Sequence, residues 1–284
     1  MTSIRRRSIT PSSTTTPSRF DASKAAARTL ARSAVLSTVG SRSTIAPSIH
    51  LLAGHDTGPP GRSDPDAFRR LLAQLGREAD LVRVEDAVAA IRRGDEVDRP
   101  MLAFTFDDGF LDCHQHLAPA LEEVGINAAF FVNSRYIGAG PAYIEHFNRT
   151  AVCNFGRLPM TGEMVRDLAE RGFVIGAHTG DHIRLDTADP AVLTDQIVRC
   201  RQEVEELAAR PCPWFAWPFG TYADFSPQAA AVAFDTYEVV FSSADHTRYT
   251  SHGGRILNRR HFEVYWPASH VRYHLRTPRR HEAG

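Results

Sequence analysis

Short continuous apolar runs alternate with longer amphipathic segments along most of this chain. Runs of four to seven apolar residues bounded by turn-forming residues are typical of buried strands. They are continuous rather than alternating with polar residues, which favours a mainly parallel sheet that is covered on both faces. The predicted strands are Ser48–Leu52, Leu81–Val84, Met101–Phe106, Ile126–Val132, Phe173–Ala177, Trp214–Trp217 and Tyr237–Phe241.

The amphipathic segments between these strands predict helices. In the first of them, Phe68, Leu71, Leu72 and Leu75 recur at helical spacing, and Gly76 follows as a C-cap. Alternating strands and helices predict an α/β fold, either a barrel or a doubly wound sheet, with ligands bound at the carboxyl ends of the strands. The predicted helices are Asp66–Leu75, Glu85–Arg93, Asp112–Val124, Thr161–Arg171, Pro190–Arg210 and Pro227–Ala233.

Two terminal segments and one long loop depart from this alternation. Residues 1–46 are rich in Ser, Thr and Arg, which predicts a disordered or weakly structured tail, with a short helix at Ala25–Val39 as an option. This composition also fits a mitochondrial transit peptide. We expect one catalytic domain over residues 47–268 and a basic tail over residues 269–284, with a solvated face at His270. The loop Asn133–Pro159 exceeds usual loop lengths, so it is expected to border a site.

Composition narrows the classes of protein and partner. The 33 basic and 33 acidic residues give a formal net charge of zero, so nothing indicates binding to nucleic acid. No run approaches the roughly 18 apolar residues of a membrane span, and no secretion signal is recognised, which favours a cytoplasmic location. The four cysteines lack CxxC spacing and are interpreted as reduced, partly buried thiols.

Three polar clusters follow predicted strands, where the carboxyl ends of a parallel sheet would bring them together. They are Asp107-Asp108-Gly109, the segment His178 to His182, and Trp217-Pro218-Phe219-Gly220. Two imidazoles and one carboxylate from different strand ends form the three-ligand set of a catalytic divalent ion, with positions left open for water and substrate. The second aspartate is then free to act as general base. Another His pair with the same spacing, His270 and His274, lies in the basic C-terminal segment and lacks this context.

These clusters resemble the first three motifs of the NodB-type polysaccharide deacetylases, carbohydrate esterase family 4. The matching segments are TFDDG at 105–109, HTGDH at 178–182 and FAWPFG at 215–220. The resemblance implies an irregular (β/α) barrel of about seven strands and removal of acetyl groups, N-acetyl rather than O-acetyl, from a polysaccharide or oligosaccharide. It implies that Asp107 is the general base and that Asp108, His178 and His182 bind one metal ion. Zinc is expected first, with cobalt, nickel or manganese as alternatives.

The same resemblance implies that the backbone N–H of Phe219 meets the oxyanion and that Pro218 and Gly220 shape its turn. Two departures leave roles open. Ala216 stands where many relatives carry an arginine that pairs with the base, so another group has to orient Asp107. Arg259 and Arg260 are candidates for contact with either the substrate or Asp107. The histidine motif that supplies the general acid is not evident.

Two histidines are candidates for the missing acid, and a third is noted for its position alone. His261 is the nearest substitute and His246 the next, although each is also explained as a surface or packing residue. His55 fits the position of a histidine near the start of many relatives, and a loop residue is its simpler interpretation.

Two other functions remain as alternatives: a carbohydrate-binding pseudoenzyme, and a non-haem Fe(II) oxygenase that uses the same two-His-one-carboxylate set. The expected partner is an acetylated carbohydrate, and the sequence does not predict an oligomeric state.

Overall fold

The computed structural model describes residues 32–58 and 63–281 of the chain. Residues 1–31 of the predicted tail lie outside the described part, and they include the first seven residues of the helix predicted at Ala25–Val39. Residues 32–40 are helical, which agrees with the rest of that predicted helix. The described strands are β1 Ile49–Gly54, β2 Asp80–Leu81, β3 Met101–Phe106, β4 Ala128–Val132, β5 Val174–Ala177, β6 Trp214–Ala216, β7 Val239–Ser242, β8 Thr250–Ser251, β9 Ile256–Asn258 and β10 Arg260–His261. All seven predicted strands are therefore present, the second reduced to two residues.

Helices connect most of these strands, and each predicted helix is confirmed. They are α2 Ala67–Leu75, α3 Val84–Arg93, α4 Ala118–Glu122, α5 Pro141–Thr150, α6 Gly162–Glu170, α7 Pro190–Leu193, α8 Cys200–Ala208, α9 Pro227–Thr236 and α10 Ala268–Leu275. Two π-helical stretches, Cys113–Leu117 and Thr194–Arg199, precede α4 and α8, and a 3₁₀ turn covers Tyr222–Asp224.

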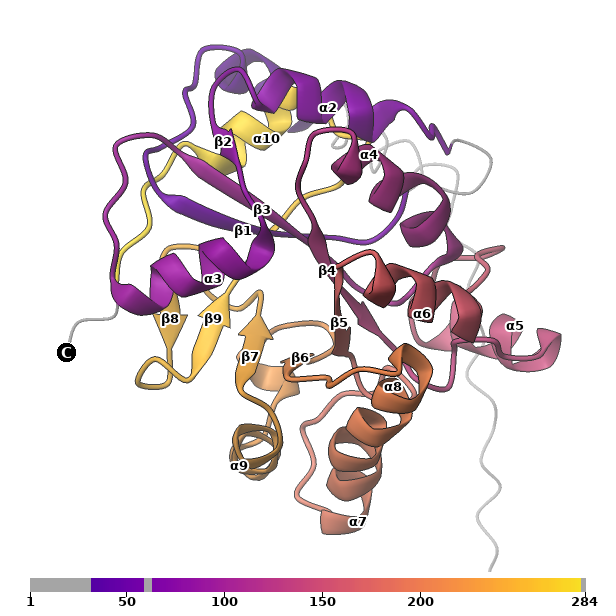
Figure 1. The fold of residues 1–284 in the computed structure, drawn as a ribbon. Helices are drawn as coiled ribbons and strands as arrows, with labels where there is room; N and C mark the ends of the chain where they lie inside the picture. The colour runs from indigo at the N-terminus through magenta and orange to yellow at the C-terminus, as the bar shows by residue number, and fades with distance from the viewer. Residues whose placement is uncertain (1–31, 59–62, 282–284) are drawn as a thin grey trace, which may run out of the picture.

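The sheet curls into an irregular barrel, as the fold prediction stated. Its strand order is β10-β1-β3-β4-β5-β6-β7-β9-β8, with β2 beside β3, and all pairs are parallel except β8 with β9. Strands β9 and β10 lie far apart in this strand order, yet only Arg259 separates them in the chain. Because β9 pairs with β7 and β10 pairs with β1, this segment links the two sides of the sheet. In Figure 1 the strands form a curved sheet, and helices α2, α4, α6 and α8 lie along its outer side.

Two apolar layers follow from the alternation of side chains along the strands. On β3, Leu102, Phe104 and Phe106 belong to the large outer core beneath the helices. Ala103 belongs to a second core inside the barrel, where it meets Phe131, Phe241 and residues of α3. Asp107 continues the inward-facing row of Ala103 and Thr105, which carries its carboxylate toward the inside of the barrel.

Three features of the fold differ from the sequence-based expectations. The loop Asn133–Pro159 contains helix α5, so it is not structureless. Strands β8 to β10 and helix α10 were not predicted. The solvated face at His270 is wrong, because this side chain is 7% exposed and accepts or donates a hydrogen bond with Ser37 Oγ.

Helix α10 packs against α2, and its Val271 and Leu275 join the outer core. Packing of its apolar side outweighs the basic composition that suggested a tail. The division into domains at residues 46 and 268 stays a prediction.

Two further observations concern thiols and membranes. All four cysteines are free, with Cys113, Cys200 and Cys212 buried and Cys153 exposed. Within residues 32–58 and 63–281, every helix is too short or too polar to cross a membrane. The cytoplasmic location stays a prediction.

Candidate active site

The three polar clusters of the sequence meet at the carboxyl ends of neighbouring strands. Asp107 and Asp108 follow β3, His178 follows β5, and Phe219 lies three residues beyond β6. Each cluster contains a non-glycine residue in the left-handed region, including Asp108 at φ 72°, His182 at φ 54° and Phe219 at φ 63°. Such backbone is costly and tends to gather at functional sites, where the surrounding structure enforces it.

Asp108 turns away from the row that Asp107 continues. Its left-handed backbone, followed by Gly109 at φ 75°, brings the second carboxylate back over the mouth of the barrel. A Cβ on Gly109 would lie 2.9 Å from Ile137 Cδ1, so both the backbone conformation and the available space require glycine. Two adjacent carboxylates thereby face one cleft, although strand alternation alone would separate them.

Asp108, His178 and His182 form a compact buried cluster. Oδ1 of Asp108 lies 3.6 Å from His178 Nε2 and 3.3 Å from His182 Nε2. The three ligand atoms lie within 4.8 Å of one another, and Oδ1 of Asp108 has no hydrogen-bond partner among the residues that the structure describes. A buried carboxylate oxygen without a donor is costly, and two imidazole nitrogens and one carboxylate are the ligand set of catalytic zinc. The residues fit a divalent cation.

Contacts behind the cluster fix the ring of His178. Its Nδ1 donates to the carbonyl of Ala216 at 2.6 Å, which leaves Nε2 with a free lone pair toward Asp108. The amide of Asn133 donates to the carbonyls of His178 and Thr179. Ala216, where many relatives have an arginine, thus contributes its backbone to orienting a histidine.

The loop that carries His182 is held by Asp181. The carboxylate of Asp181 accepts hydrogen bonds from Tyr143 Oη and from Gln196 Nε2, each at 2.6 Å, and pairs with Arg135. Tyr143 belongs to α5, one of the helices that the sequence did not predict. These contacts stabilise the left-handed backbone of the loop.

Asp107 is paired with a buried arginine. Arg259 donates from Nη1 to Oδ1 at 2.7 Å and from Nη2 to Oδ2 at 2.8 Å, and Nη1 also donates to Thr105 Oγ1 at 3.0 Å. Its guanidinium lies 5.1 Å from the ring centroid of Phe131 inside the barrel. The sequence left open which group orients Asp107, and the structure assigns this contact to Arg259.

The surroundings of the two aspartates shift their pKa values in opposite directions. Burial by itself would raise the pKa of Asp107, but the Arg259 guanidinium outweighs it and holds this pKa well below the usual range. Burial, together with the negative charge of Asp107, raises the pKa of Asp108 to about 7. Asp107 is therefore ionised at neutral pH, whereas the charge of His55 opposes but does not reverse the rise in the pKa of Asp108.

The histidines of the cluster are neutral. Burial lowers the pKa of His178 to about 4 and that of His182 well below its ordinary value. A neutral imidazole is the form that binds a metal ion.

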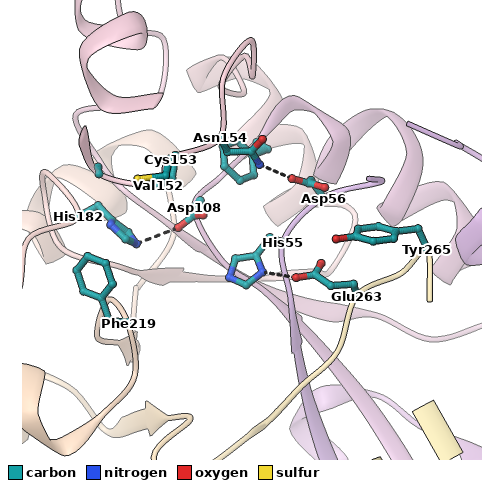
Figure 2. Close-up of a pocket in the computed structure, with 12 residues that line it drawn as sticks. His55, Asp56, Asp108, Val152, Cys153, Asn154, His182, Phe219, Glu263 and Tyr265 are labelled. Carbon is teal, nitrogen blue, oxygen red and sulfur yellow. Dashed lines mark hydrogen bonds and ion pairs between the residues drawn. The ribbon is translucent and has the colours of Figure 1, made fainter. Parts of the chain in front are cut away.

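An open cleft of about 390 Å³ lies over this cluster. Figure 2 shows Asp108, His182 and Phe219 on one side of it and His55, Glu263 and Tyr265 on the other. Val152, Cys153 and Asn154 also line it, so the long segment after β4 borders the site as predicted. His246 and His261, the two residues weighed first for the general acid, are not among its lining residues.

His55 is a functional candidate that sequence reasoning treated as a loop residue. Its Nδ1 lies 3.3 Å from Glu263 Oε1. Burial lowers the pKa of His55, but the hydrogen bond to Glu263 and the charges of Asp108, Glu263 and Asp107 together raise it to about 10. His55 is thus a protonated group facing the cleft. No pattern in the sequence indicated that Glu263 would be its hydrogen-bond partner.

The turn at residues 218–220 places one ring beside the cluster. Pro218 is buried, and the carbonyl of Gly220, which has φ 67°, accepts a hydrogen bond from Ser243 N–H. Phe219 between them is 42% exposed, its ring centroid 4.9 Å from that of His182 and 4.0 Å from the Arg184 guanidinium. This ring forms a wall of the cleft.

Comparisons with known proteins give a family match and a shared fold. Residues 94–234 match the model of the polysaccharide deacetylase family. A Bacillus subtilis (strain 168) protein named "Putative polysaccharide deacetylase YxkH" is 25% identical over 126 residues, which cover 44% of this chain and 39% of that protein. The chain thus aligns with well under half of this relative's length.

Two solved structures share the fold. IcaB from Ammonifex degensii superposes with a TM-score of 0.62 at 18% identity, over 82% of this chain and 97% of that one. The Streptococcus pyogenes deacetylase PplD, in complex with acetate, superposes with a TM-score of 0.60 at 16% identity, over 82% and 99%.

Proposed function

Because the chain belongs to the polysaccharide deacetylase family, we propose that it is a metal-dependent hydrolase that removes acetyl groups from a polysaccharide or oligosaccharide. The observation that carries the proposal is the pair of unlike aspartates. Asp107 is held ionised by Arg259, and Asp108, beside it, faces two neutral histidines in an open cleft. A base and a ligand set side by side are what metal-assisted hydrolysis needs.

Asp108, His178 and His182 would hold the ion, with zinc preferred and cobalt, nickel or manganese as alternatives. A divalent cation bound there supplies Lewis acidity, which polarises the acetyl carbonyl and acidifies water. The ligand set of two nitrogens and one oxygen suits zinc better than magnesium or calcium.

Asp107 takes the proton from the attacking water. Its carboxylate is fixed by two hydrogen bonds from Arg259, so little reorganisation is needed when the proton arrives. Arg259 is a positioning residue, since it is 1% exposed and acts on the reaction through Asp107. The backbone N–H of Phe219 is the proposed donor to the oxyanion, with Pro218 and Gly220 shaping the turn.

His55 is the proposed proton donor to the leaving group. It lines the cleft, whereas His246 and His261 do not, and Glu263 accepts from its Nδ1 so that Nε2–H can face the substrate. An amine must be protonated before it can leave, whereas an alkoxide can depart with less help. A dedicated acid therefore supports an N-acetylated amino sugar over an O-acetylated substrate.

The test is acetate release from N-acetylated amino-sugar oligomers and polymers by Asp107→Asn. Loss of general-base catalysis should lower kcat about 10²- to 10⁴-fold while the metal content of the purified protein stays unchanged. Asp186→Asn, a change at an exposed aspartate, should leave both quantities as in the wild type.

Full turnover in Asp107→Asn would reject the assigned base. Acetate release that persists with zinc as the metal and without O₂ would exclude an Fe(II) oxygenase. A protein that binds the sugar and releases no acetate would be a carbohydrate-binding pseudoenzyme.

A further inference from the structure

His55, His261 and Glu263 form a second cluster of metal-ligand type at the edge of the cleft. Nδ1 of His55 and Nε2 of His261 each lie 3.3 Å from the same oxygen, Oε1 of Glu263. All three ligand atoms lie within 4.8 Å of one another. We propose that this cluster is a second divalent-cation site, of zinc type, which fills at metal concentrations above those that load Asp108, His178 and His182.

The ligand spacing fits a tetrahedral ion. Two ligands at zinc bond lengths of about 2.0–2.1 Å on a tetrahedral centre lie roughly 3.3–3.4 Å apart. Both separations between a histidine nitrogen and Oε1 of Glu263 match this value. Two imidazoles and one carboxylate also repeat the donor chemistry of the first cluster.

The sheet fixes the positions of these ligands. β1 pairs with β10 in parallel register, with Ala53 opposite His261, and Phe262 N–H donates to the carbonyl of Ala53 at 3.0 Å. His55 lies two residues beyond Ala53, and Glu263 two residues beyond His261. The site is therefore built on paired strands near their carboxyl ends.

A cation can reach this site and still keep open coordination positions. The side chains of His261, His55 and Glu263 are 51%, 33% and 14% exposed. The first cluster is much less accessible, since its three side chains are 2% to 8% exposed. Partial exposure, which lets water compete for the ion, favours weaker binding at the second site.

Occupancy of the second site has a consequence for turnover, and this part rests on the proposed function. A cation bound at Nδ1 of His55 replaces the proton that this nitrogen donates to Glu263. His55 is then held as a metal ligand. His55 can then no longer cycle between imidazolium and imidazole. Excess zinc should therefore inhibit the enzyme through His261 and Glu263, outside the first cluster.

The experiment counts zinc ions bound to the metal-free full-length protein in an equilibrium titration. We expect one tight and one weaker ion for the wild type, one ion for His261→Ala, and two for His246→Ala, which changes another exposed histidine. Asp108→Asn should lose the tight ion and keep the weaker one. Only one ion bound by the wild type at excess zinc, or two by His261→Ala, would overturn the inference.

Acetate release at increasing zinc tests the consequence. The wild type and His246→Ala should lose activity above one equivalent of zinc, and His261→Ala should keep at least half of it. Equal inhibition of all three proteins would reject the inhibitory role. Because ion counting needs no turnover, the second site and the proposed deacetylase activity can fail independently.

Discussion

Arg259 clamps both carboxylate oxygens of Asp107, at 2.7 and 2.8 Å, although the two residues lie 152 positions apart in the chain. Arg259 is also the single residue between β9 and β10, where the chain crosses from the β7 side of the barrel to the β1 side. The segment that joins the sheet therefore also supplies the partner of the proposed base. Closure of the barrel and orientation of Asp107 depend on the same residue.

Replacing Arg259 by glutamine should impair both stability and catalysis. A buried carboxylate left without its cation costs about 3–5 kcal/mol of unfolding free energy. The pKa of Asp107 should rise, because the Arg259 charge that counteracts the effect of burial on this pKa is removed. The acid limb of the kcat/KM profile should then move to higher pH, as measured by acetate release between pH 4 and 8.

Arg255→Gln, at an exposed arginine, is the control for that change and should leave both the pH profile and the denaturation midpoint unaltered. A purely structural Arg259 would lower stability without moving the acid limb, and that result would contradict its role toward Asp107.

Replacing Glu263 by glutamine should shift the alkaline limb of the activity profile. Glu263 contributes to raising the pKa of His55 to about 10, so its neutralisation lowers this pKa. His55 is then deprotonated at a lower pH, and the alkaline limb moves toward neutrality. Glu96→Gln, at an exposed glutamate, should leave the limb in place. An unmoved alkaline limb in Glu263→Gln would argue that His55 is not the acid.

Metal-free wild-type protein should lose stability relative to Asp108→Asn as the pH rises from about 4 to about 7. The comparison with this variant is needed because the lowered pKa values of His178 and His182 act on stability in the opposite direction over part of this range. Across this interval the unfolded chain ionises Asp108, whose pKa is raised to about 7 in the folded state, while the folded protein keeps the proton. Zinc binds the ionised carboxylate, so the rise in Tm on adding zinc should be larger at pH 7.5 than at pH 5.

Calorimetric scans with and without zinc measure this effect. Asp108→Asn should remove the contribution of Asp108 to the pH dependence and most of the stabilisation by the first equivalent of zinc. A zinc-induced shift of equal size at both pH values would contradict the assignment of Asp108 as a ligand.

Replacing Gly176 by alanine should destabilise the barrel. A Cβ at this position would lie 2.4 Å from Cδ1 of Phe131, a ring that packs inside the barrel and beneath the Arg259 guanidinium. Overpacking of this kind typically costs about 1–3 kcal/mol. Gly140→Ala, where a Cβ meets no atom of the described part of the chain within 4 Å, should have little effect on the urea midpoint. Similar midpoints for the two variants would show that Phe131 relaxes without cost.

The sequence by itself determined most of the regular structure and the location of the chemistry. Continuous apolar runs identified all seven predicted strands, and helical spacing identified the helices between them, because both patterns are local consequences of burial. Polar clusters directly after β3, β5 and β6 indicated Asp107, Asp108, His178 and His182, because parallel strands bring their carboxyl ends together.

Only the tertiary structure decided which distant groups serve these residues. Strands β9 and β10 are three and two residues long, too short to give a periodic signal, and their existence depends on pairing with β7 and β1. That pairing brings Arg259 to Asp107, and it brings Glu263 to His55 across 208 positions of sequence. A salt bridge or hydrogen bond between such residues leaves no local pattern, since it arises from the geometry of the curled sheet.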